Sequence, residues 1–316
     1  METLPEEAGW QFEPKWDGFR CLVFRDGDEV ELKSKSGKSL TVFFPEVAQE
    51  MTKLRVPKFV IDGELLIAVD GQFSFGALQM RLHPAQSRIT KLASEQPATF
   101  VAFDCLLNLK GHPILQRPFS ERHKELEAFF RRARPNDAVQ LTPSTLDVEK
   151  AERWLTAAHA QTDGVIAKRL DLAYQAGERA MLKVKRLRTA DCVVGGFRYG
   201  SNSRLVGSLL LGLYDDDGLL HHVGFTSAIP AAEKPQLTKR LEKLIAPPGF
   251  TGDAPGGPSR WSTDRSADWQ PLKPKLVAEV RYDHVTDDRF RHGTRFIRWR
   301  PDKAPRQCTF EQLSAA

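Results

Sequence analysis

The chain has 316 residues, of which 41% are hydrophobic and 28% are charged, a balance that argues against intrinsic disorder. Lys and Arg number 46 against 41 Asp and Glu, and the formal net charge of +5 favours an acidic partner without requiring one. The four cysteines are far apart and no apolar run approaches a membrane span of roughly 18 residues, which argues against a paired-cysteine zinc site, a disulfide scaffold and a membrane helix.

The predicted elements of the first half are mainly antiparallel strands. Alternating apolar and polar residues over 21–34, centred on an Asp-Gly pair, predict a β-hairpin. Helices are expected after Ser120 and after Asp147, because both residue types cap helix N-termini. Since the hairpin turn is too short for a parallel crossover, this half is predicted to be mixed α+β. Further strands are expected at 58–69, 99–107, 164–168 and 180–185.

A basic stretch at 186–189 separates this half from a part with more glycine-punctuated strands. We therefore predict two domains, 1–188 and 189–316. One helix is expected at 231–244, before a loop rich in Pro and Gly. Several short strands with one helix suit a small barrel of the OB type, although other small β folds would also fit. The expected strands are 190–197, 208–214, 219–225, 276–282 and 294–299.

Short polar motifs interrupt the predicted strands of the first half. The first, residues 13–20, surrounds Lys15 before the hairpin, and a lysine beside an Asp-Gly turn is usually only a solvated loop residue. The second places Glu64 after a glycine inside an apolar strand, a pattern that a bulge or turn would also show. The third, residues 162–168, begins an apolar run at Asp163. None of these motifs alone identifies an active site.

A fourth motif places Lys183 and Lys185 on one face of a predicted strand, because side chains two residues apart point the same way. Two neighbouring cations on a partly buried face are costly unless an anion meets them, and a triphosphate is a suitable anion. An edge strand protected by lysines would show the same pattern. The pattern therefore leaves an anion site and an edge strand both open.

Together with Phe103-Asp104 and the run 295–303, these motifs occur in the order found in the covalent nucleotidyltransferases. The sequence resembles the ATP-dependent DNA ligases in particular, over nearly the whole chain. Each motif is weak by itself, whereas six in this order are specific. The resemblance implies an α+β nucleotidyltransferase (adenylation) domain of antiparallel sheets with flanking helices over 1–188, followed by an OB-fold β-barrel domain over 189–316.

The resemblance implies a reaction that stores AMP on Lys15. The lysine attacks the α-phosphate of ATP, releases pyrophosphate and holds AMP through a P–N bond. The 5′-phosphate of a nick in duplex DNA then takes the AMP, and the 3′-hydroxyl attacks the activated 5′ end. Because a charged lysine is a poor nucleophile, we expect Lys183, Lys185 and a bound metal to favour the neutral amine. ATP and Mg²⁺, with Mn²⁺ as a substitute, are the expected cofactors.

The resemblance also implies roles for further residues. Glu13 is expected to read the adenine edge, and Phe103 to stack on the adenine ring. Glu64 is expected to bind the ribose or the metal, and Asp163 to help hold Mg²⁺. The other nucleotide-binding candidates are Arg20, Arg179, Lys183, Lys185, Arg300, Asp302 and Lys303. The last three belong to the second domain, which is expected to close over ATP and then swing away to embrace DNA, about a hinge near Arg188.

Two residues depart from the family pattern. Lys35 stands where the family usually has arginine, and lysine lacks the bidentate fork that suits the DNA phosphate expected there. Asp163 stands where the family commonly has glutamate. Lys15 lies so early in the sequence that we expect no helical DNA-binding domain before the core. The chain thus resembles the compact bacterial ligase C type, or the ligase domain of the bacterial end-joining ligase.

Other functions remain open from the sequence. An RNA ligase or a GTP-dependent RNA capping enzyme would share the core, although the residues around Lys15 favour adenine and Arg300-Pro301-Asp302-Lys303 favours DNA ligases. A different class is a non-catalytic OB-fold protein that binds nucleic acid. We expect a cytoplasmic monomer that binds nicked double-stranded DNA and no membrane. A repair polymerase or an end-binding partner cannot be read from the sequence.

Overall fold

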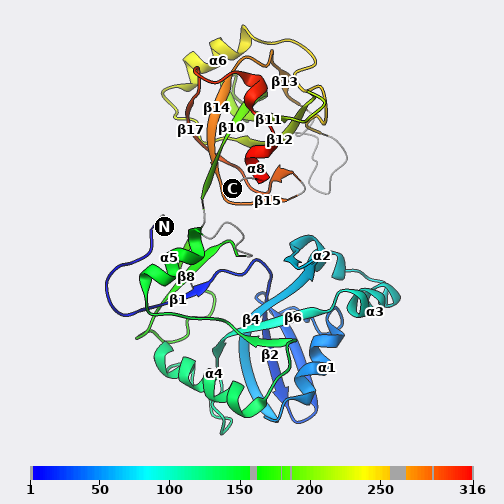
Figure 1. The fold of residues 1–316 in the computed structure, drawn as a ribbon, viewed down its shortest axis with the longest axis vertical. Coiled ribbons are helices and arrows are strands. Elements are labelled where there is room, and N and C mark those ends of the chain that lie inside the picture. The colour runs from blue at the N-terminus through cyan, green and yellow to red at the C-terminus, as the bar shows by residue number, and fades with distance from the viewer. Residues whose placement is uncertain are drawn as a thin grey trace. The chain divides into compact units, whose positions relative to one another are not determined.

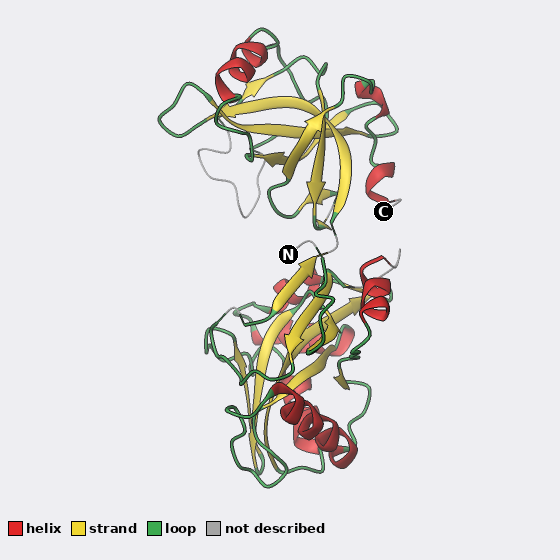
Figure 2. Ribbon diagram, turned by 90° about the vertical axis from the view of Figure 1, so that its left-hand side faces the viewer, coloured by secondary structure: helices red, strands yellow, loops and turns green. Residues whose placement is uncertain are grey.

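The computed structural model describes residues 3–156, 162–178, 180–185, 187–256, 268–286 and 288–314. The chain divides into two compact units, Met1–Arg186 and Leu187–Ala316, each with its own hydrophobic core (Figure 1, Figure 2). Strands form the centre of both units, and helices flank the sheets of the first unit. The predicted α+β class is therefore confirmed.

The main sheet of the first unit has the strand order β3-β2-β4-β6-β7, with β5 paired to β4. Only β6 and β7 pair in parallel among these strands. Alternation along β2 directs Cys21 and Val23 into the core and Arg20 to the opposite face, where it pairs with Glu64 of β4. One face of the sheet can thus carry a polar site. The strands are β2 (Phe19–Asp26), β3 (Glu29–Ser34), β4 (Lys58–Val69), β5 (Gln72–Phe73), β6 (Ala98–Cys105) and β7 (Val139–Leu141).

Helices cover the core face of this sheet. Helix α1 buries Val47 and Met51, and α4 buries Leu126 and Phe129, with the helical spacing of three or four residues that places side chains on one face. Burial of such side chains stabilises the fold by about 1.5–3 kcal/mol each. The helices are α1 (Pro45–Lys53), α2 (Phe75–Arg81), α3 (Gln86–Glu95), α4 (Phe119–Ala133) and α5 (Val148–Thr156).

A second, three-stranded sheet in the first unit has the order β1-β8-β9 and is antiparallel throughout. It comprises β1 (Trp10–Pro14), β8 (Gly164–Arg169) and β9 (Leu182–Lys185). Its small core includes Phe12 and Val165 and is covered by α5. The predicted strands did not include β1, which contains Glu13 and precedes the hairpin. Within the described residues β9 lies at the edge of its sheet, so the edge-strand reading of its two lysines also holds.

Local signals predicted several elements well. The hairpin is confirmed, with Gly27 at a positive φ of 63° in its turn. The helix expected after Asp147 begins at the next residue, and Asp147 Oδ1 accepts a hydrogen bond of 2.9 Å from the Glu149 amide. The prediction that Ser120 caps a helix was wrong, because α4 begins at Phe119, two residues before the expected start. Its N-cap residue is Pro118, which has no side-chain hydrogen bond to offer.

The second unit is built on one sheet with the order β12-β11-β10-β14-β17, and β13 pairs with β10. A parallel bridge between Thr226 and Thr294 joins the two ends of this order, so the sheet curves back on itself. The elements are β10 (Arg188–Tyr199), β11 (Val206–Tyr214), β12 (Leu220–Thr226), α6 (Lys234–Glu242), β13 (Gln270–Pro271), β14 (Val277–Tyr282), β15 (Val285–Thr286), β16 (Arg289–Phe290), β17 (Arg295–Trp299), η1 (Pro305–Gln307) and α8 (Glu311–Ser314). In the described part of the chain, no helix combines the length and the apolar character needed to cross a membrane.

Candidate active site

Lys15 lies where β1 and β8 separate. The antiparallel ladder continues one step beyond both strands, because the Lys15 amide donates to the Gly164 carbonyl at 2.8 Å and the Asp163 amide donates to the Lys15 carbonyl at 2.9 Å. This register brings the two side chains together, with Lys15 Nζ 2.8 Å from Asp163 Oδ2. Each side chain is 16% exposed, so the ion pair is half-buried but reachable.

Gly18 and Gly164, which follow Asp17 and Asp163 in the sequence, allow close backbone approach. A Cβ atom on Gly18 would lie 2.2 Å from the Leu65 carbonyl oxygen, and one on Gly164 would lie 2.1 Å from the Val184 carbonyl oxygen. Gly164 also has a φ of 149°, which side chains disfavour. The absence of a side chain at both glycines therefore lets the segments that carry Lys15 and Asp163 pack closely against their neighbouring strands.

Glu13, two residues before Lys15, forms a buried ion pair with Lys168. Their Oε2 and Nζ atoms are 2.7 Å apart, and the side chains are 3% and 6% exposed. Lys168 Nζ also donates to the Phe103 carbonyl at 2.9 Å and lies 4.6 Å from the centre of the Phe103 ring. Burial raises the pKa of Glu13, and the charge of Lys168 opposes that rise. The predicted adenine-reading carboxylate and stacking ring are thus linked through one lysine.

Arg20 is held by a bidentate ion pair with Asp62. Its Nε donates to Oδ1 at 3.1 Å and its Nη2 donates to Oδ2 at 2.6 Å. The Tyr174 hydroxyl donates to the same carboxylate at 2.8 Å. The guanidinium carbon lies 5.6 Å from the centre of the Phe103 ring. Asp62 therefore orients Arg20, whose Nη2 also donates to the Tyr174 hydroxyl at 3.3 Å.

Glu64 lies opposite Arg20 in the β2–β4 ladder. Burial, and next the charge of Asp62, raises the pKa of Glu64 to about 8, while Arg20 and Lys15 oppose the rise. A carboxyl that is protonated near neutral pH is poised to ionise when a cation or a hydroxyl donor arrives. This behaviour is compatible with the predicted contact to a ribose or a metal.

Cations gather beside Glu64. Partial burial, and then the charges of Lys15, Lys35 and Arg20, lowers the pKa of Lys183, so each of these three cations lies within electrostatic reach of Lys183. A pocket of about 610 Å³ opens next to them. Its lining residues are Gly18, Phe19, Arg20, Ser34, Lys35, Ser36, Leu40, Glu64 and Leu82. Such a concentration of positive charge suits a polyphosphate or a nucleic-acid backbone.

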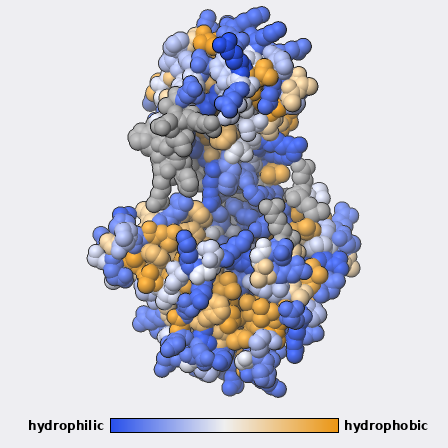
Figure 3. All heavy atoms as spheres, turned by 180° about the vertical axis from the view of Figure 1, so that it is seen from behind, coloured by the Kyte–Doolittle hydropathy of each residue, from blue (hydrophilic) through white to orange (hydrophobic). Residues whose placement is uncertain are grey.

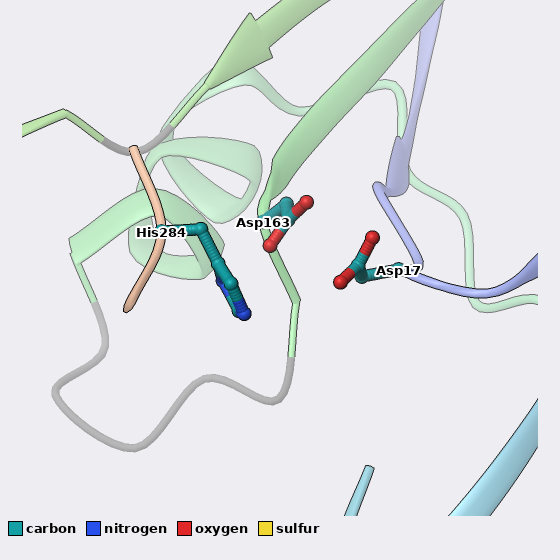
Figure 4. Close-up of side chains that lie close together, drawn as sticks. All are labelled: Asp17, Asp163 and His284. Atoms are coloured by element: carbon teal, nitrogen blue, oxygen red, sulfur yellow. The ribbon is translucent and has the colours of Figure 1, made fainter. Parts of the chain in front are cut away.

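Two carboxylates could hold a divalent cation in the first unit. One oxygen of Asp17 and one of Asp163 lie within 4.8 Å of each other (Figure 4). Carboxylate oxygens are the ligands that Mg²⁺ prefers, and Mg²⁺ commonly uses one or two of them together with substrate phosphates. The donor set therefore fits the predicted ion. Figure 4 also draws His284, which belongs to the second unit.

The predicted residues of the second unit cluster around Asp191. Arg300 Nη1 donates to both Asp191 oxygens at 3.0 Å, and Lys303 Nζ donates to Oδ2 at 2.8 Å. Arg300 also pairs with Asp302 at 2.8 Å, and this hydrogen bond lowers the pKa of Asp302 to about 2. The Asp191 side chain is 10% exposed, and this largely buried carboxylate holds both cations in place.

Several residues in these contacts had no predicted role. Lys168 ends the third motif and Asp62 lies two residues before Glu64 of the second, but nothing in their spacing showed that they would pair with Glu13 and Arg20, respectively. Tyr174 and Asp191 carried no sequence signal, because their partners lie 154 and 109 residues away along the chain. Of the predicted candidates, Arg179 lies outside the described residues.

Two family models match the chain. The ATP dependent DNA ligase domain matches residues 2–185, and the ATP dependent DNA ligase C terminal region matches residues 202–303. The first match lies on the first compact unit and the second match on the second unit. Together the two matches cover most of the sequence. They agree with the order of motifs in the sequence.

Named relatives are similar over nearly their whole length. The chain is 48% identical to DNA ligase C2 of Mycolicibacterium smegmatis, over 97% of this chain and 90% of that protein. It is 44% identical to DNA ligase C of Mycobacterium tuberculosis, over 99% of this chain and 91% of that protein. A solved structure from work on Lig E DNA ligases, described there as a minimal scaffold for DNA binding, has a TM-score of 0.56 at 18% identity and covers 95% of this chain and 98% of that one. That last likeness concerns the fold alone.

Proposed function

The chain belongs to the family of ATP-dependent DNA ligases, and on this premise we propose that Lys15 carries the AMP while nicks in duplex DNA are sealed. The observation that carries the proposal is the position of Lys15 Nζ, 2.8 Å from Asp163 in a half-buried site within electrostatic reach of Glu64 and Lys183. A solvated loop lysine would have neither the carboxylate nor the phosphate-binding neighbours.

The first step forms a P–N bond between Lys15 Nζ and the α-phosphorus of ATP and breaks the bond from that phosphorus to pyrophosphate. The amine must lose a proton before it attacks, and its Nζ lies 2.8 Å from Asp163 Oδ2. The positive charges of Lys15 and Lys183 lie within electrostatic reach of each other and would attract the triphosphate. The site therefore combines one carboxylate and a neighbouring cation around the nucleophile.

Mg²⁺ is part of this proposal. Asp163 and Asp17 would hold the ion, with Glu64 nearby as a carboxyl that ionises when the site gains positive charge. When bound, the ion would neutralise the transferring phosphoryl group. An Asp163 carboxylate engaged by the ion would hold the Lys15 ammonium less strongly, so metal binding and nucleophile activation are coupled.

The remaining roles concern the adenine base and the phosphates. Glu13, with its charge supported by Lys168, would accept hydrogen bonds from the adenine amino group, and Phe103 would stack on the ring. Lys183 and Lys185 would contact the α-phosphate. Arg300, Asp302 and Lys303 of the OB-fold domain would orient the leaving pyrophosphate, and Lys35 would contact a phosphate at the nick.

We propose that the polynucleotide substrate is nicked DNA and that the protein acts as a cytoplasmic monomer. An RNA ligase or an RNA capping enzyme is the nearest alternative, because both would use the same lysine chemistry. The test incubates the protein with labelled ATP or GTP and Mg²⁺, and then with nicked DNA or nicked RNA duplexes. Labelling by ATP and sealing of DNA supports the proposal, whereas exclusive labelling by GTP or sealing of RNA alone contradicts it.

A further inference from the structure

Glu13 lies at the end of a chain of side-chain hydrogen bonds in the first unit. Gln11 Nε2 donates to Glu13 Oε1 at 3.2 Å and lies 3.3 Å from His123 Nδ1. His123 Nε2 in turn lies 3.3 Å from Ser144 Oγ. We call these four residues the glutamine relay (Glu13, Gln11, His123 and Ser144). The relay joins β1 to α4 and to the segment between β7 and α5.

The relay lies in the interior although polar side chains have room at the surface. Hydrophilic residues cover much of the face of the first unit that Figure 3 shows. Gln11, Glu13 and His123 are instead 5%, 2% and 8% exposed. Burying polar groups is costly unless they are hydrogen-bonded, and most side-chain hydrogen bonds in proteins go to backbone or water. Three successive links between side chains therefore indicate that the relay fixes the orientation of a side chain.

Strand register places Gln11 beside Glu13. The two residues are two positions apart in β1, so their side chains point to the same face of the sheet. Lys168 is the partner of Gln11 in the β1–β8 ladder and contacts Glu13 Oε2, whereas Gln11 contacts Oε1. Because each carboxylate oxygen has a donor, the plane of the carboxylate is fixed. The lone pairs left for a ligand then have fixed directions as well.

His123 determines which way the Gln11 amide points. The amide nitrogen has two hydrogens, so it can donate to Glu13 and to His123 together only if His123 Nδ1 carries a lone pair. The ring proton then lies on Nε2, which faces Ser144. Burial lowers the pKa of His123 and favours the neutral ring, although Glu127, 3.7 Å from Nε2, opposes this shift. Without an acceptor at Nδ1, the amide could turn its oxygen toward Glu13, where two acceptors would repel each other.

The state of Glu13 matters for the choice of base. An ionised carboxylate only accepts hydrogen bonds, so it suits the 6-amino group of adenine and disfavours the 6-oxo group of hypoxanthine or guanine. Burial raises the pKa of Glu13, whereas Lys168 and then the hydrogen bond from Gln11 oppose the rise. A protonated Glu13 could donate to a 6-oxo group. Loss of the Gln11 donor should therefore weaken a preference for adenine.

We propose that Gln11 and His123 are positioning residues that set the preference of the site for adenine, by holding the Glu13 carboxylate in the orientation that accepts the 6-amino group. This inference rests on the proposed function, in which Glu13 reads the adenine edge. It goes beyond that function because it assigns base selection to two residues that act through Glu13.

The test measures formation of the lysyl-nucleotide adduct from ATP and from inosine triphosphate (ITP), which has a 6-oxo group in place of the 6-amino group. Selectivity is the ratio of kcat/KM for the two nucleotides in one preparation, so the folded fraction cancels. Gln11→Met and His123→Leu should each lower this ratio by about tenfold, because Glu13 loses a positioned hydrogen bond. The rate at saturating ATP should stay within about threefold of the parent rate, since neither residue contacts the reacting atoms.

Two further variants are the controls. His123→Asn keeps an acceptor near the position of Nδ1 and should retain most of the selectivity that His123→Leu loses. Equally low selectivity in both His123 variants would show that this acceptor does not orient the amide. Gln140→Met makes the same change as Gln11→Met at an exposed position, where Gln140 Nε2 donates to the Asp137 carbonyl at 2.8 Å. It should leave the ratio at the parent value.

The outcomes separate the relay from the proposed function. Failure of the parent protein to form any adduct would count against the proposed function. A parent that prefers ATP, together with Gln11→Met and His123→Leu variants that keep its ratio, would overturn the relay proposal alone. Equal slowing with both nucleotides would also overturn it, because the relay would then only support the fold. Equal use of ATP and ITP by the parent would overturn it too, although Lys15 would still carry the nucleotide.

Discussion

Lys15 Nζ and Asp163 Oδ2 are 2.8 Å apart although the two residues are 148 positions apart in the sequence. Strand pairing sets this distance, because the β1–β8 ladder continues through the backbone of both residues. Lys15, the proposed nucleophile, and its carboxylate partner are therefore placed by two strand ends rather than by a flexible loop. Such placement keeps an attacking group in position at little entropic cost.

Asp163→Asn should slow formation of the lysyl-AMP adduct by about a hundredfold, because the variant loses the charge of a carboxylate that we propose as a ligand of Mg²⁺. The Mg²⁺ concentration that gives half the maximal rate should rise as well. Rates of adduct formation from labelled ATP over a Mg²⁺ series measure both effects. Asp171→Asn is the control, since Asp171 pairs with Arg169 at 2.9 Å on the surface. Equal rates for the two variants would exclude a metal role for Asp163.

Glu64→Gln should change how stability depends on pH. The folded pKa of Glu64 is about 8, whereas an unfolded glutamate titrates near 4.3. Between these values the folded chain keeps a proton that the unfolded chain has lost, so the free energy of unfolding falls as pH rises. The fall continues until the pH passes about 8, where the folded carboxyl ionises too.

The glutamine variant has no proton to lose at this position, so its stability relative to the parent should increase from pH 5 to pH 8. Urea unfolding of both proteins, without nucleotide or metal, gives the comparison. The difference should grow by up to about 1.4 kcal/mol per pH unit, which is the linkage limit for one proton. A difference that stays constant over this range would show that Glu64 is ionised throughout.

Asp191→Asn should slow formation of the lysyl-AMP adduct more than it slows sealing of an adenylated nick. Asp191 anchors Arg300 and Lys303, so its loss should let both cations drift from the pyrophosphate that we propose they orient, and slow adduct formation by about tenfold or more. Sealing of a nick that is already adenylated does not involve pyrophosphate and should keep its rate. Asp215→Asn, which removes the 2.8 Å contact to His221 in the same unit, is the control. An equal loss in both reactions would indicate general damage to the OB-fold domain.

Lys168→Met should destabilise the first unit by about 3–5 kcal/mol, because it leaves the buried Glu13 carboxyl without its cation. Lys58→Met is the surface counterpart, since Lys58 pairs with Asp26 at 2.6 Å where both side chains are more than half exposed, and it should cost less than about 1 kcal/mol. Thermal or urea unfolding compares them. Adding Glu13→Gln to Lys168→Met should recover stability, and no recovery would mean that the two residues are not energetically coupled.

The sequence predicted what depends on local signals. The hairpin follows from an Asp-Gly turn between alternating residues, and Asp147 caps a helix as its residue type suggests. Helix α1 was missed although proline at its start is a known signal, and α3 begins without any side-chain cap. Motif order predicted the family, which the comparisons confirm, and its fold. The roles of the individual site residues stay predictions.

The contacts behind the motif residues could not be predicted, because each joins distant parts of the chain. Asp62 meets Tyr174 across 112 positions, and Asp191 meets Lys303 across the same separation. The partner of a charged residue depends on strand register, and a shift of one residue would turn each side chain to the other face. Sequence spacing within a motif carries no information about that register.

The most direct test of the account is to locate the adduct. The protein would be incubated with ATP and Mg²⁺, digested under conditions that preserve the P–N bond, and its peptides analysed by mass spectrometry, with Lys15→Arg as the control. We predict AMP on Lys15 alone, and no adduct in the variant. An adduct on Lys183 or another lysine, or an unmodified Lys15 in protein that seals nicks, would contradict the account.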